Sequence, residues 1–364
     1  MRAAVLGVGR VLVIDELRVD APVGREVLVR VHAVGLCHSD AHVLDGTLVR
    51  PLPLVLGHES AGIVEAVGSD VRLVSVGDHV VTCLVMGCND CARCDAGEFT
   101  RCLRPEQTKR SGSDAPRLSH EDGSIVGQMT NIGALAEYAL VDERALVRVA
   151  EDIPMTTAAI LGCAVVTGLG AVLNVARVRT GESVAIIGCG GVGLSVVQGA
   201  RIAGATTIIA VDLSREKLDL ARTLGATHTV DSSTVDAVAE VRALTGEGVD
   251  HAFEVVGRVA TVRQAFEMAA PGRRAYALGI HADDAEILLP AVGLRRGKSL
   301  VGVFMGDTNP AMDIPRYVEL WRSGELDLDG MISDVVALDG VADGFARMAA
   351  GAGARTVVSF AGPS

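Results

Sequence analysis

The sequence predicts an α/β protein with two domains, the first rich in β-strands and the second built on a doubly wound parallel sheet. A chain of 364 residues is longer than one hydrophobic core ordinarily organises. Before residue 165, short apolar segments such as 26–37 show the two-residue period of half-buried strands. From residue 183, apolar strands alternate with segments of helical period such as 214–225, which is typical of parallel βαβ units.

The charge balance argues against nucleic acid and anionic membranes as partners. The formal net charge is −12, and 49% of the residues are hydrophobic. A field of that sign repels phosphate groups, so a small-molecule partner is favoured. The N-terminal segment has no apolar run before a small-residue cleavage site, so we expect a cytoplasmic, reducing location. The uncharged runs 156–176 and 183–200 are interrupted by Gly, Ser and Thr, and we expect them to be buried core elements.

Four cysteines within residues 88–102 predict a metal site. In a reducing compartment such clusters bind metal more often than they form disulfides. Zinc accepts four thiolates tetrahedrally, and a site closed by four protein ligands is structural. A redox switch and an iron–sulfur cluster are the alternatives. The expected ligands are Cys88, Cys91, Cys94 and Cys102.

The segment VAIIGCGGVG, residues 184–193, has the G-x-G-x-x-G pattern of a dinucleotide-binding turn, starting at Gly188. Glycines there allow a tight turn, and the free N–H groups of the following helix bind a pyrophosphate. Asp212 ends the next predicted strand and suits the adenosine ribose, so NAD is favoured over NADP. Arg215 keeps NADP as an alternative, and Lys217 either reaches the ribose or lies on a solvated helix face. The expected cofactor contacts are Gly188, Gly190, Gly191, Val192, Gly193, Asp212 and Lys217.

A second group of metal-ligand residue types lies in GLCHSD and LGHES. Cys37 and His58, about twenty residues apart, suggest a metal site with an open position, which needs a third ligand. Cys163 precedes the nucleotide domain, where a crevice between domains is expected, and the alternative for it is a buried thiol. We expect Cys83 and Cys189 to be small buried hydrophobic residues.

Together these motifs resemble the zinc-dependent medium-chain alcohol dehydrogenase family over almost the whole chain. GLCHSD, GHESAG, the four-cysteine lobe, GCAVVTG and GCGGVG occur in the family's order. The resemblance implies a GroES-like catalytic domain, residues 1–164 completed by 306–364, and a Rossmann domain, residues 165–305. It also implies NAD and two zinc ions per chain, one catalytic and one structural. The loop 104–135 resembles the longer forms of the family, so we expect a homodimer, with a tetramer as the alternative.

The resemblance further implies ligands for the catalytic zinc. Cys37, His58 and Cys163 would bind it, and Glu59 would lie behind it as a carboxylate or transient ligand. Asp40 would orient His58 through the other ring nitrogen.

The family also implies a proton relay and cofactor contacts. Ser39 would take the alcohol proton and pass it through the cofactor ribose to His42. Two positions depart from the family pattern, because Ser60 replaces the usual glycine and His38 stands where some members have arginine. The remaining expected cofactor contacts are His38, Thr167, Arg258 and Arg355.

The predicted activity is hydride transfer between a primary or aromatic alcohol and NAD. Zinc held by two thiolates and an imidazole is a Lewis acid that lowers the pKa of an alcohol. Oxidation of a formaldehyde–thiol adduct is the close alternative. A non-catalytic zinc or dinucleotide sensor is the remote one, since a sensor has no need of the relay formed by Ser39 and His42.

Overall fold

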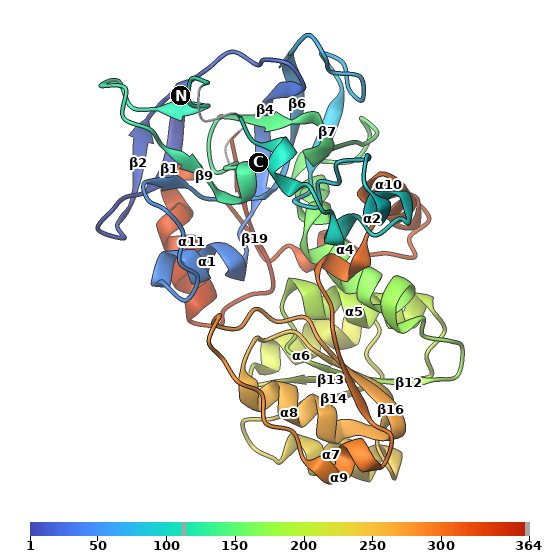
Figure 1. Ribbon diagram of the computed structural model, residues 1–364. Helices are drawn as coiled ribbons and strands as arrows, with labels where there is room; N and C mark the ends of the chain where they lie inside the picture. The colour runs from blue at the N-terminus through green and yellow to red at the C-terminus, as the bar shows by residue number, and fades with distance from the viewer. Residues whose placement is uncertain (111–113, 361–364) are drawn as a thin grey trace. The chain divides into compact units, whose positions relative to one another are not determined.

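The computed structural model describes residues 1–110 and 114–360, and the chain divides into two compact units (Figure 1). Unit 1 comprises Met1–Cys163, Asn309–Ser323 and Ile332–Ser364, and unit 2 comprises Ala164–Thr308 and Gly324–Met331. These boundaries lie close to those expected from the sequence, except that 324–331 falls in unit 2. Of the loop 104–135, residues 111–113 lie outside the described residues.

Unit 1 is built on β-sheets, and the largest has seven strands. Its order is β11-β7-β6-β4-β19-β18, with β10 also paired to β4. A four-stranded sheet has the order β2-β1-β5-β9, and β3 pairs with β8. The strands are β1 (Arg2–Leu6), β2 (Leu12–Glu16), β3 (Arg18–Val19), β4 (Glu26–Gly35), β5 (Leu54–Val55), β6 (Glu59–Val67), β7 (His79–Thr82), β8 (Leu118–Ser119), β9 (Gly127–Gln128), β10 (Tyr138–Asp142), β11 (Leu146–Arg148), β18 (Asp334–Val336) and β19 (Thr356–Ser359).

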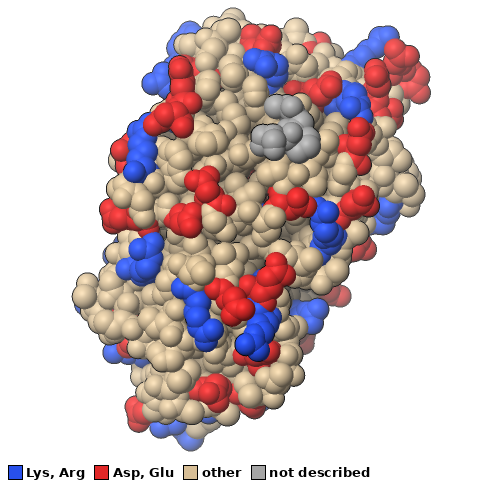
Figure 2. All heavy atoms as spheres, turned by 180° about the vertical axis from the view of Figure 1, so that it is seen from behind, with Lys and Arg blue, Asp and Glu red and all other residues tan. Residues whose placement is uncertain are grey.

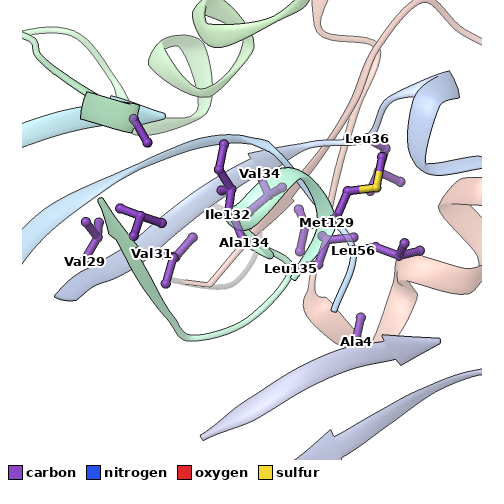
Figure 3. Packing of buried hydrophobic residues seen from close by; sticks show 14 of the residues in the cluster. Ala4, Val29, Val31, Val34, Leu36, Leu56, Met129, Ile132, Ala134 and Leu135 are labelled. Carbon is purple, nitrogen blue, oxygen red and sulfur yellow. The ribbon is translucent and has the colours of Figure 1, made fainter. Parts of the chain in front are cut away.

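The core of unit 1 follows from the alternation along β4. Val29 and Val31 are buried while Arg30 between them is exposed, because successive side chains of a strand point to opposite faces. Figure 3 shows Val29, Val31 and Val34 among the buried side chains of the cluster that also contains Leu135.

Short helices connect these strands and cover their ends. On α11, Val341 and Phe345 lie one turn apart and are buried in the same cluster. The helices of unit 1 are α1 (His38–Asp45), α2 (Ala92–Asp95), α3 (Met155–Ala159), α10 (Pro310–Arg322) and α11 (Val341–Ala349), with 3-10 turns η1 (Phe99–Arg101), η2 (Pro105–Thr108), η3 (Met129–Asn131), η4 (Glu143–Ala145), η5 (Ile160–Gly162) and η9 (Leu338–Gly340).

Unit 2 contains a six-stranded parallel sheet in the order β14-β13-β12-β15-β16-β17. The chain leaves β12 toward β13 on one side and later returns to pair β15 on the other side. Such a reversal opens a ligand-binding crevice at the carboxyl ends of the two central strands. The strands are β12 (Ser183–Ile187), β13 (Thr207–Asp212), β14 (His228–Asp231), β15 (Val249–Glu254), β16 (Ala269–Ala277) and β17 (Ser299–Gly302).

Helices connect successive strands of this sheet, as the alternating sequence pattern predicted. Buried side chains of α7 and α8 pack with the strands in one apolar cluster, to which Val241 and Phe266 contribute. The helical segments are α4 (Ala164–Gly170), the π-helical η6 (Ala171–Ala176), α5 (Gly191–Ile202), α6 (Arg215–Thr223), α7 (Ala237–Thr245), α8 (Val259–Met268), α9 (Ala291–Arg295) and the 3-10 turns η7 (Met305–Asp307) and η8 (Asp329–Met331).

The two uncharged runs form α3, η5, α4 and η6 in one case and β12 with α5 in the other, and most of their side chains are buried. Within the described residues no single helix is long and apolar enough to cross a membrane. One pair of consecutive helices, Met155–Gly162 and Ala164–Ala176, passes that test together by length and composition only.

Charged side chains of both signs are interspersed on the face seen in Figure 2, and no continuous basic stripe crosses that face among the described residues.

A fully buried glutamine attaches segment 324–331 to unit 2. Nε2 of Gln198 donates to the carbonyl of Asp327 at 2.9 Å, and Oε1 accepts from the N–H of Asp327 at 2.8 Å. This pair of hydrogen bonds joins α5 of unit 2 to the backbone of the segment.

Replacing Gln198 with leucine should lower the free energy of unfolding by about 1–3 kcal/mol, because two hydrogen bonds to the backbone of Asp327 are lost and each contributes about 0.5–1.5 kcal/mol. Denaturant melts of the variant and the wild type measure this. Gln264→Leu, a half-buried position on α8 outside this contact, is the matched control. Equal losses in both variants would contradict the role given to Gln198.

Candidate metal centres and dinucleotide site

Strand pairing brings the first group of metal-ligand side chains together. Gly35 of β4 pairs with Glu59 of β6 in antiparallel register, so Cys37 just after β4 lies at the same edge as His58 just before β6. One ligand atom each from four buried residues, all within 4.8 Å of one another, forms the group Cys37, His58, Glu59 and Cys163.

The loop that carries Cys163 approaches β7 at a distance that only glycine allows. Gly162 precedes Cys163, and a Cβ at that position would lie 1.8 Å from the carbonyl oxygen of Thr82. Any side chain there would push the loop away from the strand. Glycine at 162 therefore places Cys163 beside the other ligands.

The donor set fits zinc. Two thiols and an imidazole are the soft and borderline ligands that zinc takes in tetrahedral sites. Nε2 of His58 is buried without a hydrogen-bond partner among the described residues, so a ligand atom is available there. A hydrogen bond from Cys163 holds the pKa of Cys37 well below its usual value despite burial, and the same bond raises the pKa of Cys163.

Asp40 lies beside the imidazole, on the side opposite Nε2. Its Oδ2 lies 3.3 Å from Nδ1 of His58, and its Oδ1 accepts from the N–H of Gly57 at 2.8 Å. Burial lowers the pKa of His58, but the charges of Asp40 and Cys37 outweigh it and raise this pKa well above its usual value. A carboxylate on the far nitrogen fixes the ring orientation of a ligating histidine.

A buried ion pair lies behind the group. Nη2 of Arg355 is 2.5 Å from both carboxylate oxygens of Glu59, and Nη1 donates to the carbonyl of Leu36 at 2.9 Å. Burial raises the pKa of Glu59, whereas the charge of Arg355 opposes that change and favours the carboxylate. The sequence suggested Arg355 only as a cofactor contact. The cofactor contact of Arg355 stays a prediction. The structure shows its pairing with Glu59, which the sequence did not suggest.

The first helix carries the predicted relay on its half-exposed side. Oγ of Ser39 lies 3.5 Å from Sγ of Cys37, and His42 follows one turn later with Nδ1 3.8 Å from Oδ2 of Asp45. Residues three apart share a helix face, so the two side chains lead from the metal group toward solvent. His38 is exposed at the start of the same helix. The relay and the cofactor contact of His38 stay predictions.

The second metal group is the four-cysteine lobe, Cys88, Cys91, Cys94 and Cys102. Sγ of Cys88 lies 3.9 Å from Sγ of Cys94, near the roughly 3.8 Å that a tetrahedral zinc with bonds of about 2.3 Å imposes. Hydrogen bonds from the backbone N–H groups of Leu103 and Cys94 lower the pKa of Cys91 to about 6. The apolar cluster here consists of cysteines and Phe99, so the lobe has little core besides its metal site.

The glycine turn follows β12 as the motif predicted. Gly188 has φ +103°, and a Cβ at Gly193 would lie 1.8 Å from the carbonyl oxygen of Gly188, so neither position accepts a side chain. A Cβ at Gly190 would meet nothing within 4 Å, which leaves open space where a pyrophosphate is expected. The N–H of Cys189 donates to Oδ2 of Asp212 at 2.6 Å, which fixes that carboxylate at the end of β13.

The other predicted cofactor residues lie in unit 2. Gly191 and Val192 begin α5, and Lys217 is half-buried in the first turn of α6. Arg258 is exposed directly before α8, whereas Thr167 is buried in α4 and its Oγ1 donates to Sδ of Met305. Their contacts with a cofactor stay predictions.

Sequence reasoning missed Glu254, the fully buried last residue of β15. Its Oε1 accepts hydrogen bonds from the N–H groups of Val256 and Gly257 and from Oγ1 of Thr261, each at 2.8 Å. This carboxylate fixes the turn that carries Arg258. The available signal was an acidic residue between an apolar strand and a turn containing glycine.

Two family models match the chain. The alcohol dehydrogenase GroES-like domain matches residues 24–151, and the zinc-binding dehydrogenase model matches residues 191–323. The chain belongs to the zinc-dependent medium-chain alcohol dehydrogenase family.

Full-length relatives agree with this membership. The S-(hydroxymethyl)glutathione dehydrogenase of Paracoccus denitrificans is 34% identical over 372 residues, covering 99% of each chain. An alcohol dehydrogenase zinc-binding domain protein from Burkholderia ambifaria has a TM-score of 0.92 at 36% identity, covering 100% of this chain and 99% of that one. Benzyl alcohol dehydrogenase from Acinetobacter calcoaceticus has a TM-score of 0.90 at 32% identity, covering 98% of each chain.

Membership confirms the predicted family, fold class and type of enzyme. This alcohol dehydrogenase is a zinc-dependent oxidoreductase with a GroES-like part and a Rossmann part, uses a nicotinamide dinucleotide, and acts on small-molecule alcohols or aldehydes. The roles of individual site residues stay predictions.

Replacing Cys91 with serine should remove one zinc ion per chain and lower the thermal midpoint by several degrees, because the lobe depends on its metal site for order. Metal content and thermal melts measure this. Cys83→Ala, a buried thiol outside both groups, should keep the wild-type zinc content. A Cys91→Ser variant with unchanged metal and midpoint would show that the lobe is not a zinc site.

Proposed function

We propose that this alcohol dehydrogenase oxidises primary or aromatic alcohols to aldehydes with NAD, and reduces the aldehydes in reverse. The observation that carries the proposal is the convergence of four buried ligand-type side chains, one of which is already engaged by an arginine. Cys37, His58 and Cys163 converge, while Arg355 engages both oxygens of the fourth candidate, Glu59. Three protein ligands and one free position are the arrangement of catalytic rather than structural zinc.

Residues around the metal group have separate tasks. When bound, zinc supplies a Lewis acid that lowers the pKa of an alcohol, and the dinucleotide supplies the hydride acceptor. Asp40 holds the His58 ring in orientation. Oγ of Ser39 accepts the substrate's hydroxyl proton while releasing its own proton toward solvent, and His42 is the next titratable group in that direction on the same face of α1.

The preference for NAD rests on Asp212. Its two oxygens accept hydrogen bonds from the N–H groups of Cys189 and Ser214, so the carboxylate is held in one orientation. A fixed negative charge at the end of the second strand favours ribose hydroxyls and repels a 2′-phosphate.

A second candidate substrate is a formaldehyde–thiol adduct. The curated relatives named S-(hydroxymethyl)glutathione dehydrogenase favour it, whereas the structural similarity to a benzyl alcohol dehydrogenase favours an aromatic alcohol. Both reactions need the same metal group, so only substrate tests separate them.

We also propose a cytoplasmic homodimer. The strand β17 lies at one edge of the six-stranded sheet. Val292, Leu294 and Phe304, in the segments flanking this strand, are 52%, 54% and 58% exposed. An edge strand flanked by exposed apolar side chains is a typical surface for a second copy.

The first test is NADH formation by the purified enzyme with aliphatic alcohols, benzyl alcohol, and formaldehyde with and without glutathione. Turnover of free alcohols is the expected result. Activity only with formaldehyde and glutathione together would select the second candidate. Silence throughout would contradict a dehydrogenase and favour a sensor.

Ser39→Ala serves as the control for this assay. We expect turnover to fall about 100-fold while zinc content stays the same, since removing a proton acceptor typically costs that much. Ser69→Ala, on an exposed loop, should leave turnover unchanged. Full activity in Ser39→Ala would remove the proton role of Ser39.

Asp212→Asn should raise the ratio of NADP to NAD activity about tenfold, corresponding to about 1.4 kcal/mol. The amide oxygen can still accept from the N–H of Cys189 or of Ser214 but not from both, so the variant removes the charge and one of the two hydrogen bonds. KM values for both dinucleotides measure this, with Asp219→Asn on the exposed side of α6 as the control. An unchanged ratio would show that Asp212 does not select the cofactor.

A further inference from the structure

Ser60, where the family usually has glycine, faces a threonine across two strands. It lies on β6 beside Ala61, which pairs with Val81 of β7, and Thr82 follows Val81. The two hydroxyl oxygens are 2.9 Å apart, and both side chains are 1% exposed. Burying two hydroxyls is unfavourable unless their hydrogen-bonding capacity is used.

The Thr82 hydroxyl uses all of its capacity. It donates to the carbonyl oxygen of His58 at 3.0 Å and accepts from the N–H of Ser60 at 3.0 Å. A hydroxyl has one proton to donate, so Oγ of Ser60 is the donor in the contact between the two side chains. The chain of hydrogen bonds therefore runs from Ser60 through Thr82 to His58.

This series of hydrogen bonds ends on the peptide that links His58 and Glu59, two residues of the metal group with Cys37 and Cys163 (called the catalytic group below). Because a peptide unit is planar, fixing the carbonyl of His58 also fixes the direction in which Glu59 leaves. The imidazole of His58 is held by Asp40, and the carboxylate of Glu59 is held by Arg355. Thr82 adds a third contact, a hydrogen bond to the backbone between His58 and Glu59.

Thr82 also lies against the loop of the third ligand. Its carbonyl oxygen is the atom that a Cβ at Gly162 would meet at 1.8 Å, and Gly162 precedes Cys163. Thr82 thus contacts the backbone beside two proposed zinc ligands. Its hydroxyl bonds to the carbonyl of His58, and its carbonyl lies against Gly162, the residue before Cys163.

We propose that the hydroxyl pair of Ser60 and Thr82 positions His58 and thereby slows the release of zinc from the catalytic group. This inference rests on the proposed function, in which Cys37, His58 and Cys163 bind that zinc. Ser60, which departs from the family pattern, is hydrogen-bonded to Thr82 in this chain.

Thr82→Val tests the proposal, because valine keeps the shape and removes the donor to His58. We expect zinc release to a chelator from the catalytic group to become about tenfold faster, as loss of partners around metal ligands commonly weakens binding 10- to 100-fold. Release from the four-cysteine lobe should not change. Cobalt substituted at the catalytic group should show a shifted visible absorption spectrum.

Matched variants separate positioning from a general loss of stability. Thr82→Ser keeps the hydroxyl and should retain the wild-type rate of zinc release. Thr245→Val removes a threonine hydroxyl that donates to the carbonyl of Val241 on α7, and it should also leave zinc release unchanged. Ser60→Ala should have a smaller effect than Thr82→Val, and the double variant should not be additive, because both act on one chain of hydrogen bonds.

The outcomes are distinguishable. If the wild type holds two zinc ions and neither Thr82→Val nor Ser60→Ala changes zinc release or the cobalt spectrum, the positioning role is overturned. If the wild type holds zinc only at the four cysteines, the proposed function fails instead.

Discussion

Unpaired charge cannot be buried at the edge where β4 meets β6, and this constraint organises unit 1. His58 and Glu59 are fully buried there, each beside an oppositely charged side chain. Removing one partner of such a pair leaves a buried charge that costs several kcal/mol. Asp40 from α1 and Arg355 from before β19 therefore have fixed places. The thiols of Cys37 and Cys163 complete the group.

The strand pairing explains how distant segments meet this requirement. β19 pairs with β4 in antiparallel register, with Val357 opposite Gly35. Arg355, two residues before Val357, therefore lies beside Leu36, the residue before Cys37. The C-terminal segment therefore contacts the metal group through Arg355, although more than 290 positions separate Arg355 from Glu59. Because the C-terminal part of the chain returns to unit 1, the guanidinium of Arg355 pairs with the buried carboxylate of Glu59.

In unit 2 the comparable constraint is the close approach of neighbouring loops at glycine positions. A Cβ at Gly188 would lie 2.7 Å from Cγ2 of Val256, and one at Gly257 would lie 2.3 Å from the carbonyl oxygen of Ile280. Three loops, after β12, β15 and β16, thus pack on one another where only glycine fits. Glu254 fixes the middle loop through its hydrogen bonds. These contacts shape the edge of the sheet at which a dinucleotide is expected.

The family resemblance, rather than the residue pattern, suggested Cys163 as the third ligand of the group with Cys37 and His58. The sequence by itself determined the order of the motifs, the alternation of strands and helices in unit 2, and the four cysteines of the other metal group. These features depend on local spacing: the cysteines of 88–102 are close in sequence, and the glycines of 188–193 form one turn. Only the tertiary structure decided what surrounds them. The pairing of Arg355 with Glu59, the hydrogen bonds from Ser60 through Thr82 to His58, and the attachment of 324–331 by Gln198 all join residues far apart in the chain or on neighbouring strands. Such contacts depend on strand register and burial, which the residue pattern of a single sequence does not encode locally.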